Sequence, residues 1–239
     1  DDDNKMMIDV GLSTLFMCGL FLAAFTATGV ISQEIERRTV LTVVSKPVAR
    51  PTFILGKFLG CAAALSIAFW TLVMVFLLTV RHRLMQTASA EFGQPVLTFG
   101  ILGALTALLG SLLVNYLYRW VFNSIFAVSL VVLMTLAWVL VMLINPQWEI
   151  QSFTTDIDGQ LMMALLLTFE GLLIITAVAI AASTRLGQIM TLLICLGVFM
   201  LGLSSDYMLG RFRDTHMVAD VLYRLIPNMY FIWMAEELT

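Results

Sequence analysis

Charged side chains are scarce in this chain. Only 12% of its 239 residues are Asp, Glu, Lys or Arg, whereas 60% are hydrophobic. Soluble domains carry roughly twice that fraction of charge. Because there are too few polar side chains to cover a water-facing surface, the composition excludes a soluble globular domain. We therefore expect an integral, multi-pass protein of the plasma (inner) membrane, surrounded by lipid over most of its length.

Residues that bind metals or attack substrates are also few. Cys18, Cys61 and Cys195 each lie inside an apolar stretch, where a thiol is typically a small packing residue. His82 and His216 are far apart and have no neighbouring cysteine or carboxylate pattern typical of a zinc site. Neither an HExxH motif nor a phosphate-binding Gly-Lys loop occurs. We expect no catalytic residue, metal or cofactor in this chain, and no nucleic-acid partner.

Six apolar stretches dominate the sequence, and each has about the 20 residues that a helix needs to cross a bilayer. Backbone groups in lipid must form hydrogen bonds within their own segment, so the stretches are expected to be helices. The prediction is an all-α, polytopic helix bundle that forms one transmembrane domain over residues 1–239. The expected spans are 10–32, 58–80, 96–118, 121–144, 161–183 and 186–205.

Three of these stretches carry small residues four positions apart, a spacing that lets two helices approach closely. The triplets are Gly19-Ala23-Ala27, Gly60-Ala64-Ala68 and Gly103-Ala107-Ser111. Such spacings also arise by chance in apolar helices that are rich in glycine and alanine. The triplets therefore indicate a packed bundle without identifying which helices pair.

The distribution of lysine and arginine predicts which loops are cytoplasmic. If the first span runs from the outer side to the cytoplasm, only Arg81 and Arg83 lie in the two outer loops. The cytoplasmic connections would then hold most of the basic residues, namely Arg37, Arg38, Lys46, Arg50, Lys57, Arg119 and Arg185. This orientation places the loop of residues 33–57 in the cytoplasm.

That loop is the most informative segment of the chain. Its first part, up to Pro47, has the alternation of charged and apolar residues typical of a short amphipathic helix. Pro47 and Pro51 predict a bend, after which Thr52 is expected to cap the next helix. Lys57 would then mark the membrane surface.

The loop sequences Glu-Ile-Glu-Arg-Arg-Thr (34–39), Ser-Lys-Pro-Val-Ala-Arg (45–50) and Phe-Ile-Leu-Gly-Lys-Phe-Leu-Gly (53–60) resemble the loop after the second span of type-2 permeases of ATP-binding-cassette exporters. The chain is most similar to the subgroup that serves sodium extrusion and nitrous-oxide-reductase maturation. Phe-Glu-Gly at 169–171, followed by Ser-Thr-Arg at 183–185 between two spans, and Leu-Ile-Pro-Asn at 225–228 also resemble that family.

The resemblance implies a transport subunit that is not itself an enzyme. Two permease copies or paralogues would sit on cytoplasmic ATPases, which would bind the ATP and Mg that this chain lacks. A rigid cytoplasmic coupling helix would transmit the closure of the ATPases to the first two spans. The implied ATPase-coupling residues are Glu34, Glu36, Arg37, Arg38 and Thr39, and the implied loop and membrane-surface motif is Lys46, Pro47, Arg50, Gly56 and Lys57. Without the resemblance, the same charges would serve only to solvate and anchor a loop.

Glu170 is the one acid well inside a span. An ionised carboxylate there costs several kcal/mol, so it should be paired, protonated or directed at a polar cavity. One interpretation is a residue that lines the translocation path or couples a proton. The other is an interhelical hydrogen bond to Asn115, Asn123 or a serine or threonine of another span.

The tail of residues 207–239 contains an amphipathic stretch that ends at Pro227 and is expected to lie in the outer interface. In the family a similar element forms re-entrant helices, so Pro227 and Asn228 are the implied outer re-entrant motif. The family's simplest members have a span before the first one here and another after the tail, so both ends are expected to be truncated. They also lack a counterpart of the hairpin of residues 96–144.

Two other functions fit parts of the sequence. An ion-coupled secondary transporter would use Glu170 as its coupling acid, but we find no inverted repeat or matching pair of broken spans. A non-transporting assembly subunit or membrane enzyme would need polar catalytic residues at one membrane face. The expectation is therefore an ATP-driven exporter permease that forms the translocation path, with an ATPase, a second permease and membrane lipid as its partners.

Overall fold

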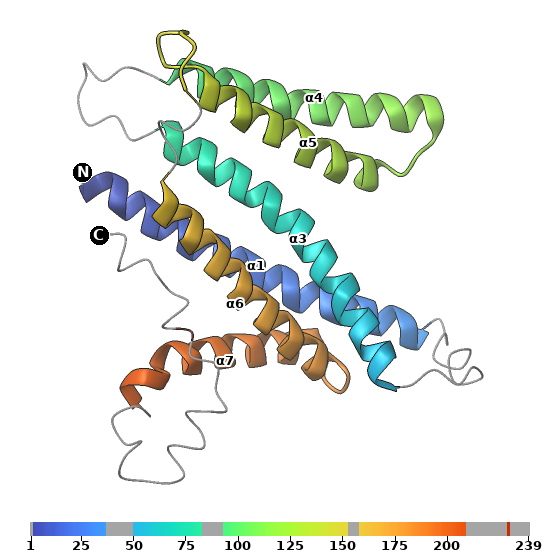
Figure 1. Cartoon of the computed structure of the whole chain (residues 1–239). Coiled ribbons are helices and arrows are strands. Elements are labelled where there is room, and N and C mark those ends of the chain that lie inside the picture. The colour runs from blue at the N-terminus through green and yellow to red at the C-terminus, as the bar shows by residue number, and fades with distance from the viewer. Residues whose placement is uncertain (1, 37–49, 83–92, 153–157, 209–228, 230–239) are drawn as a thin grey trace. The chain divides into compact units, whose positions relative to one another are not determined.

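The computed structural model describes residues 2–36, 50–82, 93–152, 158–208 and 229 (Figure 1). These residues form six helices and no strand, and an isolated bridge pairs Ile144 with Ile150. The helices are α1 (Asp2–Glu36), α3 (Arg50–His82), α4 (Gln94–Tyr118), α5 (Phe122–Leu143), α6 (Gly159–Ser183) and α7 (Gln188–Met208).

Each of the six helices contains a stretch long and apolar enough to cross a membrane. These stretches are Lys5–Val30, Pro51–His82, Gln94–Tyr118, Phe122–Leu143, Gly159–Ser183 and Gln188–Ser205. The predicted all-α, multi-pass class is therefore confirmed, and each expected span falls in its own helix. Four of the six agree with the expected limits within two or three residues, and the first two helices extend further.

The observed helix limits differ most from the expected span limits on either side of the predicted cytoplasmic loop. α1 continues without a break to Glu36, beyond the expected end of the first span at residue 32, and α3 begins at Arg50, well before residue 58. Hydropathy shows where a helix enters lipid, but backbone hydrogen bonding continues past that boundary. Gln33–Glu36 therefore extend α1, and the rest of the expected coupling helix lies outside the described residues.

The expectation that Thr52 caps the following helix is wrong. Because α3 begins at Arg50, Thr52 lies inside its first turn and Pro51 takes the second helical position. Proline is tolerated there since the first backbone N–H groups of a helix have no intrahelical partner. The proline that suggested a boundary thus belongs to the helix itself.

The chain divides into two compact units, which are described separately. Unit 1 comprises Asp1–Gly11 and Ile67–Leu161, and unit 2 comprises Leu12–Ser66 and Met162–Thr239. α1 and α3 each contribute one part to both units. The α4–α5 hairpin belongs to unit 1, whereas α6, α7 and the helix ends on either side of the predicted coupling loop belong to unit 2.

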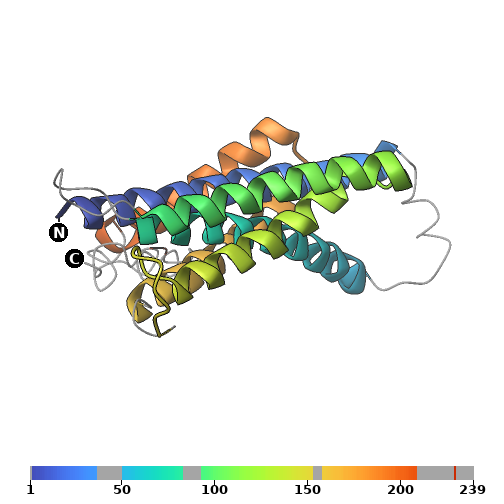
Figure 2. The same ribbon diagram turned by 90° about the horizontal axis from the view of Figure 1, so that it is seen from above.

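In unit 1, α4 and α5 form an antiparallel hairpin whose helices run side by side in both views (Figures 1 and 2). Arg119 ends α4 in the left-handed conformation, with φ 57°, and its N–H donates to the Asn115 carbonyl at 3.0 Å. The Asn115 side-chain amide donates to the Trp120 carbonyl at 2.5 Å. These bonds satisfy carbonyls at the helix end and close a three-residue turn.

Small residues and serines form the contact between α4 and α5. Ala107 and Ser111 are 0% and 1% exposed, and the Ser111 and Ser129 hydroxyls lie 3.0 Å apart. A Cβ placed on Gly103 would lie 3.4 Å from the Leu133 carbonyl oxygen. The triplet Gly103-Ala107-Ser111 is therefore a true helix-packing surface, as the spacing allowed.

We expect Gly103→Leu to separate the two helices of this hairpin. The atom nearest to the new Cβ is the Leu133 carbonyl oxygen in the backbone of α5, which cannot move aside as a flexible side chain can. Overpacking of this kind costs about 1–3 kcal/mol. Thermal unfolding of the purified chain in detergent should show the loss, whereas Gly110→Leu should be neutral because nothing lies within 4 Å of a Cβ there. Equal stability of the two variants would contradict this packing.

Other contacts in unit 1 join α3 and the loop after α5 to the hairpin. The Trp70 indole N–H donates to the Thr135 hydroxyl at 3.0 Å, which joins α3 to α5. Trp148 has a positive φ of 63° in the turn after α5, and its ring centroid lies 6.1 Å from that of Phe99. The hydrogen bond between Trp70 and Thr135 thus pairs two polar groups of different spans.

In unit 2, α1 packs against both α6 and α7. Phe16 stacks on Phe199 of α7 with 4.5 Å between ring centroids, and Gly19 meets the side chain of Leu172 of α6. Ala23 and Ala27 are 1% and 0% exposed on the same side of α1. The triplet Gly19-Ala23-Ala27 is therefore a packing surface as well.

The first two residues of the third triplet make no helix contact among the residues that the structure describes. Gly60 and Ala64 are exposed on α3, and a Cβ on Gly60 would have nothing within 4 Å. Only two of the three small-residue triplets therefore serve contacts inside the described structure, although all three have the same spacing.

Candidate functional site

Two helix ends of unit 2 bracket the predicted coupling loop. Glu34 and Glu36 belong to the last turns of α1, and Arg50 is the first residue of α3. The other predicted coupling and loop residues lie outside the described residues: Arg37, Arg38, Thr39, Lys46 and Pro47. The structure thus places the loop between two continuous helices, and the coupling role of its residues stays a prediction.

α1 extends beyond its apolar stretch, whereas the apolar stretch of α3 begins at Pro51, the second residue of the helix. The apolar stretch of α1 ends at Val30, and the six further helical residues add about 9 Å at 1.5 Å per residue. Lys57 and Arg81 are 24 residues apart in α3, which corresponds to about 36 Å, slightly more than the roughly 30 Å of a hydrocarbon core. This length is compatible with the prediction that Lys57 marks the membrane surface.

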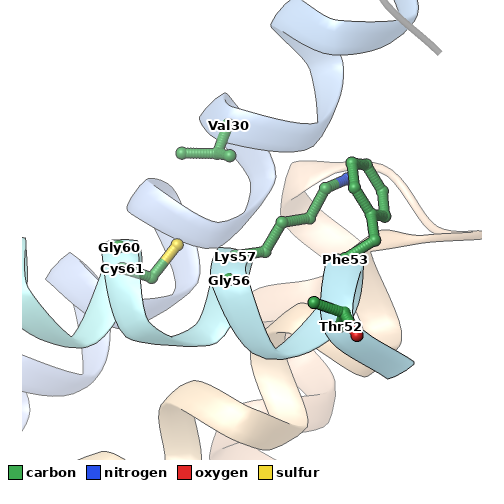
Figure 3. A pocket seen from close by; sticks show the side chains of 7 residues that line it. All are labelled: Val30, Thr52, Phe53, Gly56, Lys57, Gly60 and Cys61. Carbon is green, nitrogen blue, oxygen red and sulfur yellow. The ribbon is translucent and has the colours of Figure 1, made fainter. Parts of the chain in front are cut away.

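A groove lies where α1 and α3 approach this surface, and Figure 3 shows it from close by. Its volume is about 460 Å³. It is lined by Val30 of α1 and by Thr52, Phe53, Gly56, Lys57, Gly60 and Cys61 of α3. Of the predicted loop and membrane-surface motif, the structure therefore brings Gly56 and Lys57 together in one place.

The Lys57 ammonium is held over an aromatic ring. Its Nζ atom lies 4.3 Å from the centroid of Phe53, which is within the range of a cation–π interaction. Cys61 is buried one turn further along, whereas Gly56 and Gly60 are exposed. A cation thus occupies one end of the groove and an apolar floor the other.

Four residues of the groove were not predicted from the sequence to belong to a site, namely Val30, Phe53, Gly60 and Cys61. A signal was present, since Phe53, Lys57 and Cys61 follow one another at four-residue spacing and must share one face of a helix. Nothing in the sequence indicated that this face would remain open next to Val30.

Glu170 lies near the middle of α6 and is exposed in the chain. Among the residues that the structure describes, it forms no hydrogen bond or ion pair with another side chain. Met163 and Leu166, 54% and 65% exposed, continue its face, whereas Leu172 and Ile175 on the opposite face are fully buried. The Asn115 amide, one expected partner, is bonded to the Trp120 carbonyl.

The predicted outer re-entrant motif, Pro227 and Asn228, lies outside the described residues. The next residue, Met229, is 2% exposed, and its N–H donates to the Gly202 carbonyl of α7 at 3.3 Å. The chain directly after the motif therefore contacts α7. In the part of the chain that the structure describes, no group of three or more His, Cys, Asp and Glu could hold a metal ion.

Six helices, each long and apolar enough to cross a bilayer, define a multi-pass integral membrane protein. The sequence matches the model of the ABC-2 family transporter proteins over residues 2–150, from α1 through α5. Because the match covers more than half of the chain, the chain belongs to the ABC-2 transporter family. No curated protein and no solved structure matches it.

Membership of this family assigns a function at the level of the class. The chain is a permease subunit of an ATP-binding-cassette transporter and an integral multi-pass membrane protein. The family implies a separate ATP-binding-cassette ATPase as a partner.

Proposed function

We propose that this chain, paired with a second permease copy or a paralogue, forms the translocation path of an ATP-driven exporter. The cytoplasmic loop of residues 33–57 couples it to the ATPase, which binds the ATP and Mg. The resemblance of residues 34–60 to the permeases for sodium extrusion and nitrous-oxide-reductase maturation supports an exporter of that subgroup.

The observation that carries this proposal is the continuity of α1 and α3 through the membrane surface. α1 runs from Asp2 to Glu36 and α3 from Arg50 to His82, each as one uninterrupted helix. A force applied to the loop would therefore move two rigid rods rather than be absorbed in a flexible joint. Rigid elements of this kind can carry a displacement from the ATPase to the core of the bundle.

The exposed face of α6 supports a polar path next to Glu170. A carboxylate in contact with lipid near the middle of a span costs about 2.5–3.5 kcal/mol on insertion scales. A face that carries Met163, Leu166 and Glu170 is thus better directed at a water-filled cavity that a second permease subunit completes. This supports the assignment of Glu170 to the translocation path.

The test of coupling uses the full-length chain, copurified with candidate ATPases and reconstituted in liposomes. We expect Glu34→Ala/Arg37→Ala/Arg38→Ala to abolish stable association or to lower ATP hydrolysis by the complex several-fold, because hydrogen bonds to charged groups contribute about 1.5–3 kcal/mol.

A matched control is Arg185→Ala, since Arg185 is an exposed cation in the turn between α6 and α7. It should leave both association and hydrolysis unchanged. If the triple variant binds and hydrolyses ATP like the original protein, the assignment of the coupling loop is wrong.

A further inference from the structure

The groove beside Lys57 lies at the depth where lipid headgroups meet acyl chains. The length of α3 between Lys57 and Arg81, about 36 Å, places Lys57 just outside the hydrocarbon core. Cys61 is one turn deeper, about 6 Å nearer to the bilayer centre. The groove that both residues line therefore spans the boundary between the polar and the apolar part of one leaflet.

The groove is polar at the end nearer to the membrane surface and apolar at the end nearer to the bilayer centre. Thr52 and Lys57 supply a hydroxyl and an ammonium at the outer end, whereas Gly60, Cys61 and Val30 form an apolar inner end. Figure 3 shows the Lys57 side chain reaching towards the Phe53 ring, and the Cys61 sulfur directed at α1. A ligand that fits must be anionic at one end and apolar at the other.

The size and surroundings of the groove favour a lipid. Its volume of about 460 Å³ lies within the roughly 300–1,000 Å³ of small-molecule sites, which suits a glycerophosphate group and the first part of an acyl chain. Ile54, Leu55 and Leu59 on the same stretch of α3 are each more than half exposed. A surface this apolar, next to a cation at this depth, is in contact with phospholipids.

The glycines make room for such a chain. Gly56 and Gly60 are one turn apart on α3, and a Cβ on either would meet no other atom within 4 Å. Among the described helices, the two glycines are therefore not needed for close packing. Their effect is to leave a channel along the helix surface from Lys57 towards Cys61.

We propose that this groove is a binding site for an anionic phospholipid of the surrounding leaflet. The Lys57 ammonium binds the phosphate, and an acyl chain begins along Gly56 and Gly60. The proposal rests on the position of α3 in the membrane and is independent of ATPase coupling. A bound lipid would hold the first turns of α3 at the membrane surface.

Photocrosslinking can test this site. The full chain is reconstituted in phosphatidylcholine nanodiscs with a trace of phosphatidylglycerol that carries a diazirine near the carboxyl end of one acyl chain. Mass spectrometry then identifies the labelled peptide. We expect labelling within residues 52–61, competed about fivefold better by unlabelled phosphatidylglycerol than by phosphatidylcholine, which is the preference expected of one lysine near an anionic headgroup.

Three variants separate charge from shape. Lys57→Gln should remove the preference for phosphatidylglycerol, and Lys57→Arg should keep it. Gly60→Leu should block labelling by filling the channel, and the open space there lets the helix accept the larger side chain. Arg185→Gln is the matched control, because it removes an exposed cation that does not line this groove. Circular dichroism and gel filtration check that each variant is folded.

Several results would overturn the proposal. Labelling outside residues 52–61 would show that the groove holds no lipid. Equal competition by phosphatidylcholine would show that no anionic headgroup is recognised. An equal loss of preference in Lys57→Gln and Arg185→Gln would reduce the effect to general surface charge.

Discussion

Replacing Gly19 with leucine is expected to break the contact between α1 and α6. A Cβ at this position would lie 2.3 Å and 2.8 Å from the two methyl carbons of Leu172 and 3.1 Å from its Cγ. Leu172 is fully buried, so its side chain has little room to move away. Forcing extra carbons into a filled contact costs about 1–3 kcal/mol, and more where the neighbour is confined.

The measurement is thermal unfolding of the purified chain in detergent, followed by circular dichroism. Gly19→Ala should lower the midpoint and Gly19→Leu should lower it further, because the second change adds more volume to the same contact. Gly29→Leu, on an exposed part of the same helix with nothing within 4 Å, should leave the midpoint unchanged. If both leucine variants unfold at the same temperature, α1 and α6 do not pack at Gly19.

A cysteine at residue 166 or 170 is expected to react with a membrane-impermeant maleimide at least tenfold faster than one at residue 109. The nucleophile is the thiolate, which forms only where water reaches the sulfur. Leu166 and Glu170 share the exposed face of α6, and Leu109 is an exposed residue of α4. If the α6 face borders the translocation path, water reaches it, whereas a cysteine in contact with lipid stays protonated.

This comparison uses the permease–ATPase complex in liposomes, with Cys18, Cys61 and Cys195 replaced by serine. Leu166 and Leu109 are 65% and 57% exposed, so protein in the chain covers the two positions to a similar degree. Equal, slow reaction at all three positions would remove Glu170 from the path. Reaction at residue 166, with Glu170 present, that depends on an ion gradient and not on ATP would favour an ion-coupled transporter.

Part of the candidate site was evident from the sequence and part was not. The charges at 34–38 and Pro47 predict a connection between two spans, because charged side chains are unfavourable in lipid and proline is unfavourable inside a helix. The helix ends were not evident, since Glu34 and Glu36 extend α1 and Pro51 lies in the first turn of α3. The cation–π contact of Lys57 with Phe53, by contrast, depends on the rotamer of a long side chain. The opening next to Val30 depends on how α1 approaches α3.

The sequence by itself determined the class of this protein and the number of apolar helices in the described chain. The physical reason is local: a stretch of about 20 apolar residues must form its hydrogen bonds internally, whatever surrounds it. The three small-residue triplets show where that reasoning ends. They share one spacing, yet Gly19 and Gly103 meet neighbouring helices and Gly60 meets none.

Only the tertiary structure decided which faces are covered. A side chain is buried only when a second segment packs against it. The sequence of α6 alone therefore could not show that Leu172 lies in the core while Glu170 remains exposed. The same holds for Ser111 and Ser129, whose hydrogen bond joins helices that the sequence presents as separate apolar stretches. Spans follow from the properties of single residues in lipid, whereas contacts and grooves follow from how the helices fit against one another.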